Sequence, residues 1–203
     1  HPRSVHAAGS DAVRIGLIGC GGRGAGAVAS ALSVNPSAKL VGVSDAFKDR
    51  AETACAQLKK MFPDQVAVDS DHLFDDFNGY LRLLESGVDV ALLAEPPHFR
   101  PKHAEACVEA GVHTFLEKPM ASTVADSRAM VEAARASDKY FMVGHIVRFN
   151  PRYAAVKREI AAGKIGKIVS IYARRNVPVS IGAAVLPKIG PIIGDGVHDT
   201  DIM

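Results

Sequence analysis

VRIGLIGCGGRGAGAVASALS, residues 13–33, is the stretch of this sequence that decides its fold class. It begins with VRIGLIG, a short β-branched run that predicts a buried strand. A glycine cluster fills residues 19–24, and the small-residue stretch at 25–33 predicts a helix immediately afterwards. A strand, a glycine turn and a helix in this order predict the first unit of a parallel α/β sheet.

The same alternation of apolar strands and helices continues to residue 148. Parallel strands need right-handed crossovers, and these crossovers place helices on both faces of the sheet. The pattern therefore predicts a doubly wound parallel α/β domain, a Rossmann fold, over residues 11–148. Further strands are expected at 38–45, 88–96, 112–119 and 139–147, and helices at 47–62, 80–87, 101–111 and 123–138.

The character of the sequence changes after RFNP, residues 148–151. RYAAVKREIAAG (152–163) predicts a helix and KIVSIYARRN (167–176) predicts a long strand, while the remainder is rich in glycine and proline. We interpret residues 149–203 as the beginning of a second α/β domain that the chain does not complete. Residues 1–10, HPRSVHAAGS, are expected to be a flexible leader or a stub left by processing.

Composition argues against several classes of partner. The chain has 24 Lys+Arg and 22 Asp+Glu, a formal net charge of +2, and no basic run, so we expect no nucleic-acid or membrane-surface partner. No apolar stretch approaches the roughly 20 residues of a membrane-spanning helix. Cys20, Cys55 and Cys107 form no CxxC pair, which argues against a disulfide framework or a zinc site. A cytoplasmic location is expected, with export followed by signal removal as the alternative.

The glycine cluster fits the pattern GxGxxG, with Gly19, Gly21 and Gly24 in the glycine places. The first glycine of this pattern permits a tight turn, and the second lets backbone N–H groups approach a pyrophosphate. The third lets the helix pack on the strand. The position between a predicted strand and a predicted helix favours dinucleotide binding over a ligand-free glycine turn.

Asp45, at the end of the second predicted strand, indicates which dinucleotide is bound. It stands 21 residues after Gly24, where a carboxylate accepts hydrogen bonds from the ribose hydroxyls and repels a 2′-phosphate. NAD is therefore the expected cofactor, in preference to NADP. Lys48 and Arg50 follow closely and could weaken this preference, although both are expected on the exposed face of a helix.

Two further clusters carry residues suited to proton transfer. Lys118, within Glu117-Lys118-Pro119, follows a strand at the carboxyl edge of the sheet, where such folds bind ligands; the alternative is a solvated lysine. Asp195-Gly-Val-His198-Asp199-Thr-Asp201 opens a predicted helix with His198 and Asp201 one turn apart. Histidine exchanges protons near neutral pH, and a neighbouring carboxylate supports its cation. Asp195 could also cap the helix, and a metal site is the less favoured reading.

With these motifs the chain resembles the glucose–fructose oxidoreductase and inositol dehydrogenase family (Gfo/Idh/MocA) from Val13 to its end. The resemblance rests on GLIGCGGRG, VGVSD, PPHFRPKHAEACVEAGVHTFLEKP, VGHIVRFNP and GDGVHDTD. It implies an N-terminal NAD(P)-binding domain and a C-terminal α/β domain whose open sheet binds substrate and often forms homo-oligomers.

By the same resemblance Lys118 and His198 are catalytic, and the Lys118–Pro119 peptide bond is cis. Asp195 is the third expected catalytic residue. Many members carry an aspartate four residues before the histidine, where this chain has Gly194, so Asp195 stands one position closer. No metal is expected in the site.

The expected cofactor-binding residues follow strand ends or lie at the domain junction. Arg148 and Asn150 belong to the RFNP turn and are expected to line the cleft between the domains; the alternative for Arg148 is an ion pair with a nearby carboxylate. Where many members have Thr-Pro-Asn after the fourth strand, this chain has Glu-Pro-Pro at 95–97. The expected set is Gly19, Gly21, Gly22, Arg23, Gly24, Asp45, Pro96, His98, Glu117, Lys118 and Arg148.

The resulting hypothesis is an NAD-dependent oxidoreductase that acts on a secondary hydroxyl of a sugar, sugar derivative or cyclitol. His198 would take the hydroxyl proton and Lys118 would stabilise the developing alkoxide. One alternative is a glycoside hydrolase that reduces and reoxidises NAD within a turnover, and another is a non-catalytic NAD-binding protein. The expected partners are a small carbohydrate or cyclitol substrate and, through the second domain, further copies of the chain.

Overall fold

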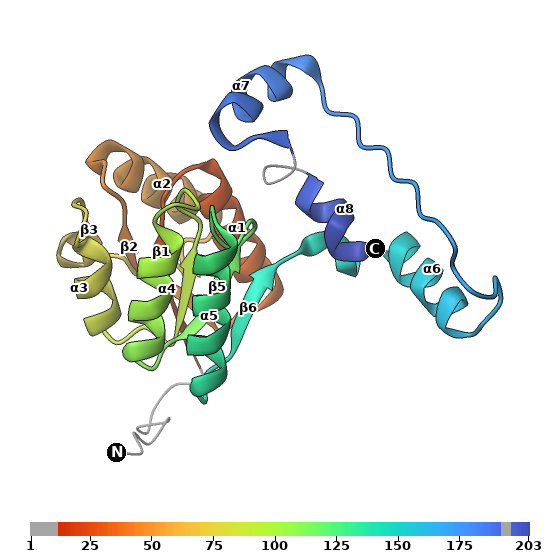
Figure 1. The fold of residues 1–203 in the computed structure, drawn as a ribbon. Helices are drawn as coiled ribbons and strands as arrows, with labels where there is room; N and C mark the ends of the chain where they lie inside the picture. Colours follow the sequence, from red (N-terminus) through yellow and green to blue (C-terminus); the bar gives the residue numbers. More distant parts are fainter. Residues whose placement is uncertain (1–11, 192–195) are drawn as a thin grey trace.

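A six-stranded parallel sheet forms the first part of the molecule (Figure 1). The computed structural model describes residues 12–191 and 196–203. Every pair of neighbouring strands is parallel, and the strand order is β3-β2-β1-β4-β5-β6. The strands are β1 (Val13–Ile18), β2 (Ala38–Ser44), β3 (Leu73–Phe74), β4 (Val90–Leu93), β5 (His113–Glu117) and β6 (Phe141–Gly144).

Helices cover both faces of this sheet, so the predicted doubly wound parallel fold is confirmed. One core cluster joins the sheet to α1 and α2 and includes Val28, Leu32 and Leu58. A second cluster, on the other face, joins it to α3, α4 and α5 through Leu83, Cys107 and Met130 among others. The helices are α1 (Gly22–Val34), α2 (Lys48–Met61), α3 (Gly79–Glu85), α4 (Arg100–Glu109) and α5 (Val124–Ala136), with a 3₁₀ turn η1 at Ser70–His72.

The strand order reverses between β1 and β4, because the chain starts in the middle of the sheet and adds strands first on one side and then on the other. In parallel sheets this reversal opens a crevice at the carboxyl ends of the strands, and ligands bind there. The residues that directly follow β1, β2, β4, β5 and β6 therefore share one edge, which we call the carboxyl edge.

The second part of the chain extends away from the sheet (Figure 1). It contains the 3₁₀ turn η2 (Ile146–Phe149), then α6 (Pro151–Ala161), α7 (Val179–Ile189) and α8 (Val197–Ile202). Helix α8 returns to pack against η2. Among the described residues, no helix is both long and apolar enough to cross a membrane.

The strand predicted at 167–176 is wrong in this structure. These residues are exposed and have no regular secondary structure, and part of the Gly/Pro-rich remainder forms α7 instead. A strand needs a neighbour for its N–H and C=O groups. The described residues after 149 contain no second strand that could pair with it.

Two glycines of α1 provide a matched test of the packing between α1 and β1. A Cβ added at Gly24 would overlap the carbonyl oxygen of Gly19, whereas at Gly26 it would meet no atom within 4 Å. We expect Gly24→Ala to lower the free energy of unfolding by about 1–3 kcal/mol through overpacking. Gly26→Ala should raise it by up to about 1 kcal/mol, because alanine favours helix. Urea unfolding followed by circular dichroism measures both, and equal effects would contradict the packing described here.

Candidate cofactor site and active site

The glycine loop between β1 and α1 is closed on one side and open on the other. Gly19 has φ +90°, and a Cβ there would lie 2.5 Å from the backbone nitrogen of Glu95. Gly24 packs against the Gly19 carbonyl. At Gly21 and Gly22 an added Cβ would meet no atom within 4 Å. The loop is thus packed closely against the sheet at Gly19 and Gly24, while Gly21 and Gly22 border open space. A pyrophosphate could bind in this space, at the N-terminus of α1.

An open pocket of about 480 Å³ adjoins this loop, between the start of α1 and residues 49–57 of α2. This volume lies in the range of roughly 300–1,000 Å³ that small-molecule sites occupy. The glycine loop and α2 supply its walls: Cys20, Gly21, Gly22, Ala25, Asp49, Arg50, Thr53, Ala54 and Gln57.

Asp45 follows β2 and is tied to the glycine loop. One carboxylate oxygen accepts the backbone N–H of Cys20 at 2.8 Å, and the other accepts that of Phe47 at 3.0 Å. A carboxylate has about four acceptor positions, so two such bonds leave room for hydroxyl donors. Asp45 can therefore hold the loop and accept hydrogen bonds from a ribose at the same time.

The three cysteines are free thiols. Burial raises the pKa of Cys20 far above its ordinary value, and it raises the pKa of Cys55 to about 11 and that of Cys107 to about 12. A protonated thiol is a poor nucleophile and a poor metal ligand. Within residues 12–191 and 196–203, no group of three or more His, Cys, Asp or Glu side chains is arranged to hold a metal ion.

An ion pair joins the glycine loop to the end of β5. The carboxylate of Glu117 is only 2% exposed and accepts from the guanidinium of Arg23, in the first turn of α1. Lys118 follows immediately at the carboxyl edge. The Lys118–Pro119 bond is cis, as the resemblance implied.

Arg100, which the sequence analysis did not single out, lies beside this segment. It is 5% exposed, and its Nε donates to the carbonyl oxygen of Glu95 at 2.9 Å. Its Nη1 donates to the carbonyl of Glu117 at 2.6 Å and to that of Pro119. The available signal was an arginine directly before a proline at the start of a predicted helix, which by itself indicates no partner.

Glu95 and His103 form a second buried pair that sequence reasoning missed. His103 Nδ1 lies 3.1 Å from Glu95 Oε1, and its ring packs on Tyr80 with centroids 4.1 Å apart. The other carboxylate oxygen of Glu95 is buried without a hydrogen-bond partner in the structure. Glu95 stands after β4, where this chain has Glu-Pro-Pro and many members of the resembling family have Thr-Pro-Asn, and His103 comes from α4.

Pro96 and His98 follow on the exposed surface of the same turn. The His98 ring meets Phe99 edge-on, with centroids 5.4 Å apart. Their role in cofactor binding stays a prediction, as does that of the other expected residues at the carboxyl edge.

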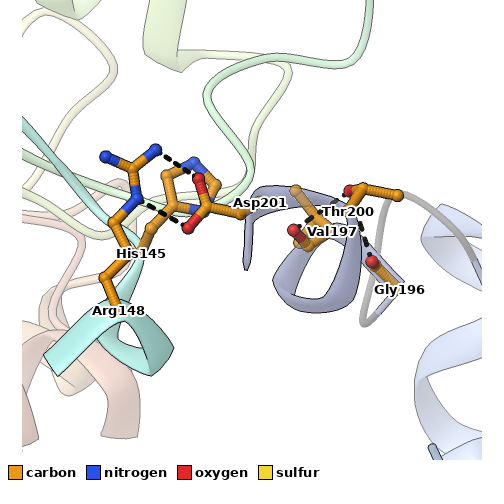
Figure 2. A network of polar contacts seen from close by, with 6 residues as sticks. All are labelled: His145, Arg148, Gly196, Val197, Thr200 and Asp201. Carbon is orange, nitrogen blue, oxygen red and sulfur yellow. Dashed lines mark hydrogen bonds and ion pairs between the residues drawn. The ribbon is translucent and has the colours of Figure 1, made fainter. Parts of the chain in front are cut away.

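Figure 2 shows how η2 is joined to α8. Arg148 Nε and Nη2 donate to the two carboxylate oxygens of Asp201 at 2.7 and 2.5 Å. His145, directly after β6, has its Nδ1 3.6 Å from the same carboxylate. Arg148 thus forms the ion pair that was its alternative assignment, and its contact with a cofactor remains a prediction. Asn150 accepts the N–H of Arg152 and caps α6.

His198 is 7% exposed and precedes two arginine-bound aspartates on α8. Asp199 accepts from Nε and Nη2 of Arg175, both at 2.8 Å, while Asp201 accepts from Arg148. These arginines lower the pKa of both aspartates. The expected turn of separation between His198 and Asp201 is present, but the Asp201 oxygens are directed to Arg148. Asp195 lies outside the described residues.

The carboxyl edge brings most of the expected residues together. The glycine loop, Asp45 and Lys118 follow strand ends on this edge, and Glu117 is the last residue of β5. The Asp201 carboxylate of α8 lies 3.6 Å from His145 Nδ1, after β6. Its charge and that of Lys118 both act on the pKa of this imidazole, in opposite directions. His145 belongs to the VGHIVRFNP motif, from which no role for it was predicted.

His145 offers a test of the docking of α8. Burial lowers its pKa, and the Asp201 carboxylate opposes that shift. We expect Asp201→Asn to lower the pKa of His145 further, because this change removes a negative charge beside the ring. NMR titration of the His145 ring signals measures it, with Asp199→Asn as the control because Asp199 is not among the main charges acting on His145.

The sign of the result is informative. A pKa rising toward the ordinary value of about 6.5 in Asp201→Asn would mean that α8 had left the ring. Because the unfolded chain takes up this proton at higher pH than the folded one, the free energy of unfolding should also fall as the pH drops below about 6.5.

Comparison with known proteins gives a consistent result. The sequence profile of the Gfo/Idh/MocA family, described as an oxidoreductase family with an NAD-binding Rossmann fold, matches residues 13–145. Inositol 2-dehydrogenase 2 of Saccharopolyspora erythraea is 32% identical over 192 residues, which are 94% of this chain and 52% of that protein. The scyllo-inositol 2-dehydrogenase (NAD(+)) of Bacillus subtilis is 29% identical over 193 residues, with the same coverage of 94% and 52%.

A solved structure shares the fold. The crystal structure of myo-inositol 2-dehydrogenase from Lactobacillus plantarum superposes with a TM-score of 0.76 at 22% identity, covering 94% of this chain and 55% of that one. The chain thus spans about half the length of the relatives it matches. Since the profile covers the whole sheet, from β1 to the end of β6, the chain belongs to the Gfo/Idh/MocA oxidoreductase family.

Proposed function

We propose that the complete protein is an NAD-dependent dehydrogenase that oxidises a secondary hydroxyl of a cyclitol of the inositol type. The relatives named as inositol 2-dehydrogenases support this substrate class, because two of them align over 94% of this chain. We also propose that residues 149–203 begin the substrate domain, and that assembly into oligomers would use the rest of that domain.

One observation carries the proposal: Lys118 stands at the carboxyl edge and is connected to the glycine loop. The Arg23–Glu117 ion pair links the first turn of α1 to the residue before Lys118. A group that binds the loop and a group that reacts at Lys118 would therefore be held by one continuous set of contacts. A lysine that only interacts with solvent would not require the residue before it to be paired with the glycine loop.

The residues of the loop fit a dinucleotide. Gly21 and Gly22 leave space for a pyrophosphate, and Asp45 has acceptor positions left for a ribose. When bound there, NAD would supply the hydride acceptor that an alcohol oxidation requires. Asp45 would also repel the 2′-phosphate of NADP, so the proposal includes a preference for NAD.

The chemistry of alcohol oxidation assigns roles to Lys118 and His198. The hydroxyl proton must leave as the hydride departs from the same carbon, so a base and a positive charge are both needed. An imidazole suits the first task near neutral pH. The ammonium of Lys118 would stabilise the developing alkoxide.

The NAD preference is tested by calorimetric titration with NAD and NADP. We expect NAD to bind at least about tenfold more tightly, which is 1.4 kcal/mol and within reach of one charge repulsion at close range. Asp45→Ser should narrow the difference by removing that repulsion. Asp64→Ser, an exposed aspartate after α2, is the control. Equal binding of both cofactors by the unaltered chain would contradict the assignment of Asp45.

The catalytic assignment is tested in the complete protein with myo- and scyllo-inositol, following the formation of NADH by absorbance. Lys118→Ala and His198→Ala should each lower the rate by about a hundred-fold to ten-thousand-fold and combine less than additively. NAD affinity should stay nearly unchanged. Lys60→Ala, at an exposed lysine of α2, should have no effect.

Two results would contradict the proposal in different ways. Cleavage of an aryl glycoside without net NADH would indicate a hydrolase that recycles its NAD. Binding of NAD without turnover of any cyclitol or sugar would indicate a non-catalytic NAD-binding protein.

A further inference from the structure

Arg100 contacts the main chain on both sides of Lys118. Its guanidinium donates to the carbonyl oxygens of Glu117 and Pro119, the residues on either side of the lysine. The third acceptor, the carbonyl of Glu95, belongs to the end of β4. One side chain therefore ties the two carbonyls that bracket Lys118 to the neighbouring strand end.

A guanidinium suits this task better than any other side chain. It is planar and presents five N–H donors in a fixed fork, so it can span carbonyls that come from different segments. An ammonium is a compact donor on a flexible stem and imposes no such geometry. The three bonds place the peptide groups around Lys118 at fixed directions relative to β4.

Burying this cation has a cost that the site compensates. Burial lowers the pKa of Arg100, and the carboxylates of Glu95 and Glu117 act in the opposite direction. Both carboxylates are buried, and Glu117 is also paired with Arg23. A residue retained only to fill space at the start of α4 would need neither the charge nor its compensation.

We propose that Arg100 is a positioning residue for Lys118, acting as a clamp on the carbonyls of Glu117 and Pro119. The inference rests on the proposed function in one respect, because Lys118 is taken as the group that reacts. Arg100 itself touches neither substrate nor cofactor in this proposal. Its effect on the reaction passes through the main chain on both sides of Lys118.

The test compares Arg100→Lys, which keeps the charge and loses the fork, with Arg100→Met, which loses both. In the complete protein we expect both to lower kcat for inositol oxidation at least tenfold, with the Kd for NAD and the KM for inositol changed less than twofold. Arg135→Met, at an exposed arginine of α5, should leave all three values unchanged. Thermal unfolding under the assay conditions establishes that the variants are folded.

A second measurement needs no turnover. Limited acetylation followed by mass spectrometry gives the labelling rate of Lys118 relative to Lys60 in the same molecule. We expect this ratio to change at least threefold in Arg100→Lys and to stay constant in Arg135→Met. If Arg100→Met does not fold, Arg100→Lys alone decides.

The outcomes separate the two proposals. If the unaltered protein oxidises no cyclitol, the proposed function fails and the labelling ratio still tests the clamp. An unchanged labelling ratio in Arg100→Lys, or a kcat within twofold of the unaltered protein, overturns the clamp. A loss of NAD binding as large as the loss of kcat also overturns it, because the substitution would then act on the whole domain.

Discussion

The close approach of α1 to the loop after β1 is the contact on which the candidate site depends. Gly24 lies against the carbonyl of Gly19. This close contact allows α1 to begin four residues after β1 ends, at Gly22 after Ile18. Gly19, at positive φ, in turn lies against the backbone of Glu95 at the end of β4. A side chain at either glycine would separate these elements. The glycines therefore set the distance between the helix N-terminus and the strand ends as well as the shape of the loop.

Several ionisable side chains are buried at this edge of the sheet. Glu95, Arg100 and Glu117 are all buried, with 6%, 5% and 2% of their surface exposed. Arg100 satisfies main-chain carbonyls, Glu117 pairs with Arg23, and Glu95 pairs with His103 through one oxygen. Breaking a buried pair typically costs about 3–5 kcal/mol because it leaves a charge without a partner. The arrangement thus favours one geometry of the strand ends over others.

Much of the fold could be predicted from the sequence because it depends on local patterns. Apolar runs and glycine turns located five of the six strands and the helices between them. The pattern missed β3, because two residues cannot show a periodicity, and it began α1 too late because glycines are poor helix formers. It was wrong about 167–176, because a strand exists only with a neighbour and the pattern of one segment contains no information about its neighbour.

The site was predictable where its residues follow strand ends and not where they depend on packing. The glycine loop, Asp45 and Lys118 each stand at a position fixed by the order of the elements. Arg100 acts through carbonyls up to 19 residues away in the chain, and Arg148 meets Asp201 across 53 residues. Such contacts depend on how helices lie on the sheet, and no motif in a single sequence records that. No role was predicted for His145, because its contact with Asp201 comes from a residue 56 positions later in the chain.

The two expected catalytic residues are held by different kinds of interaction. The residues on both sides of Lys118 are held by buried hydrogen bonds from Arg100 to their carbonyl oxygens. The helix that carries His198 is held through side chains, by Arg148 and Arg175. Arg148 is 61% exposed and its partner Asp201 is 7% exposed, while Arg175 and Asp199 are 29% and 17% exposed. An ion pair with a solvent-exposed partner is weakened by salt, whereas buried hydrogen bonds to a charged donor are screened much less and contribute about 1.5–3 kcal/mol each. The lysine is therefore the fixed half of the pair, and the alignment of the histidine depends on how the second part of the chain docks on η2.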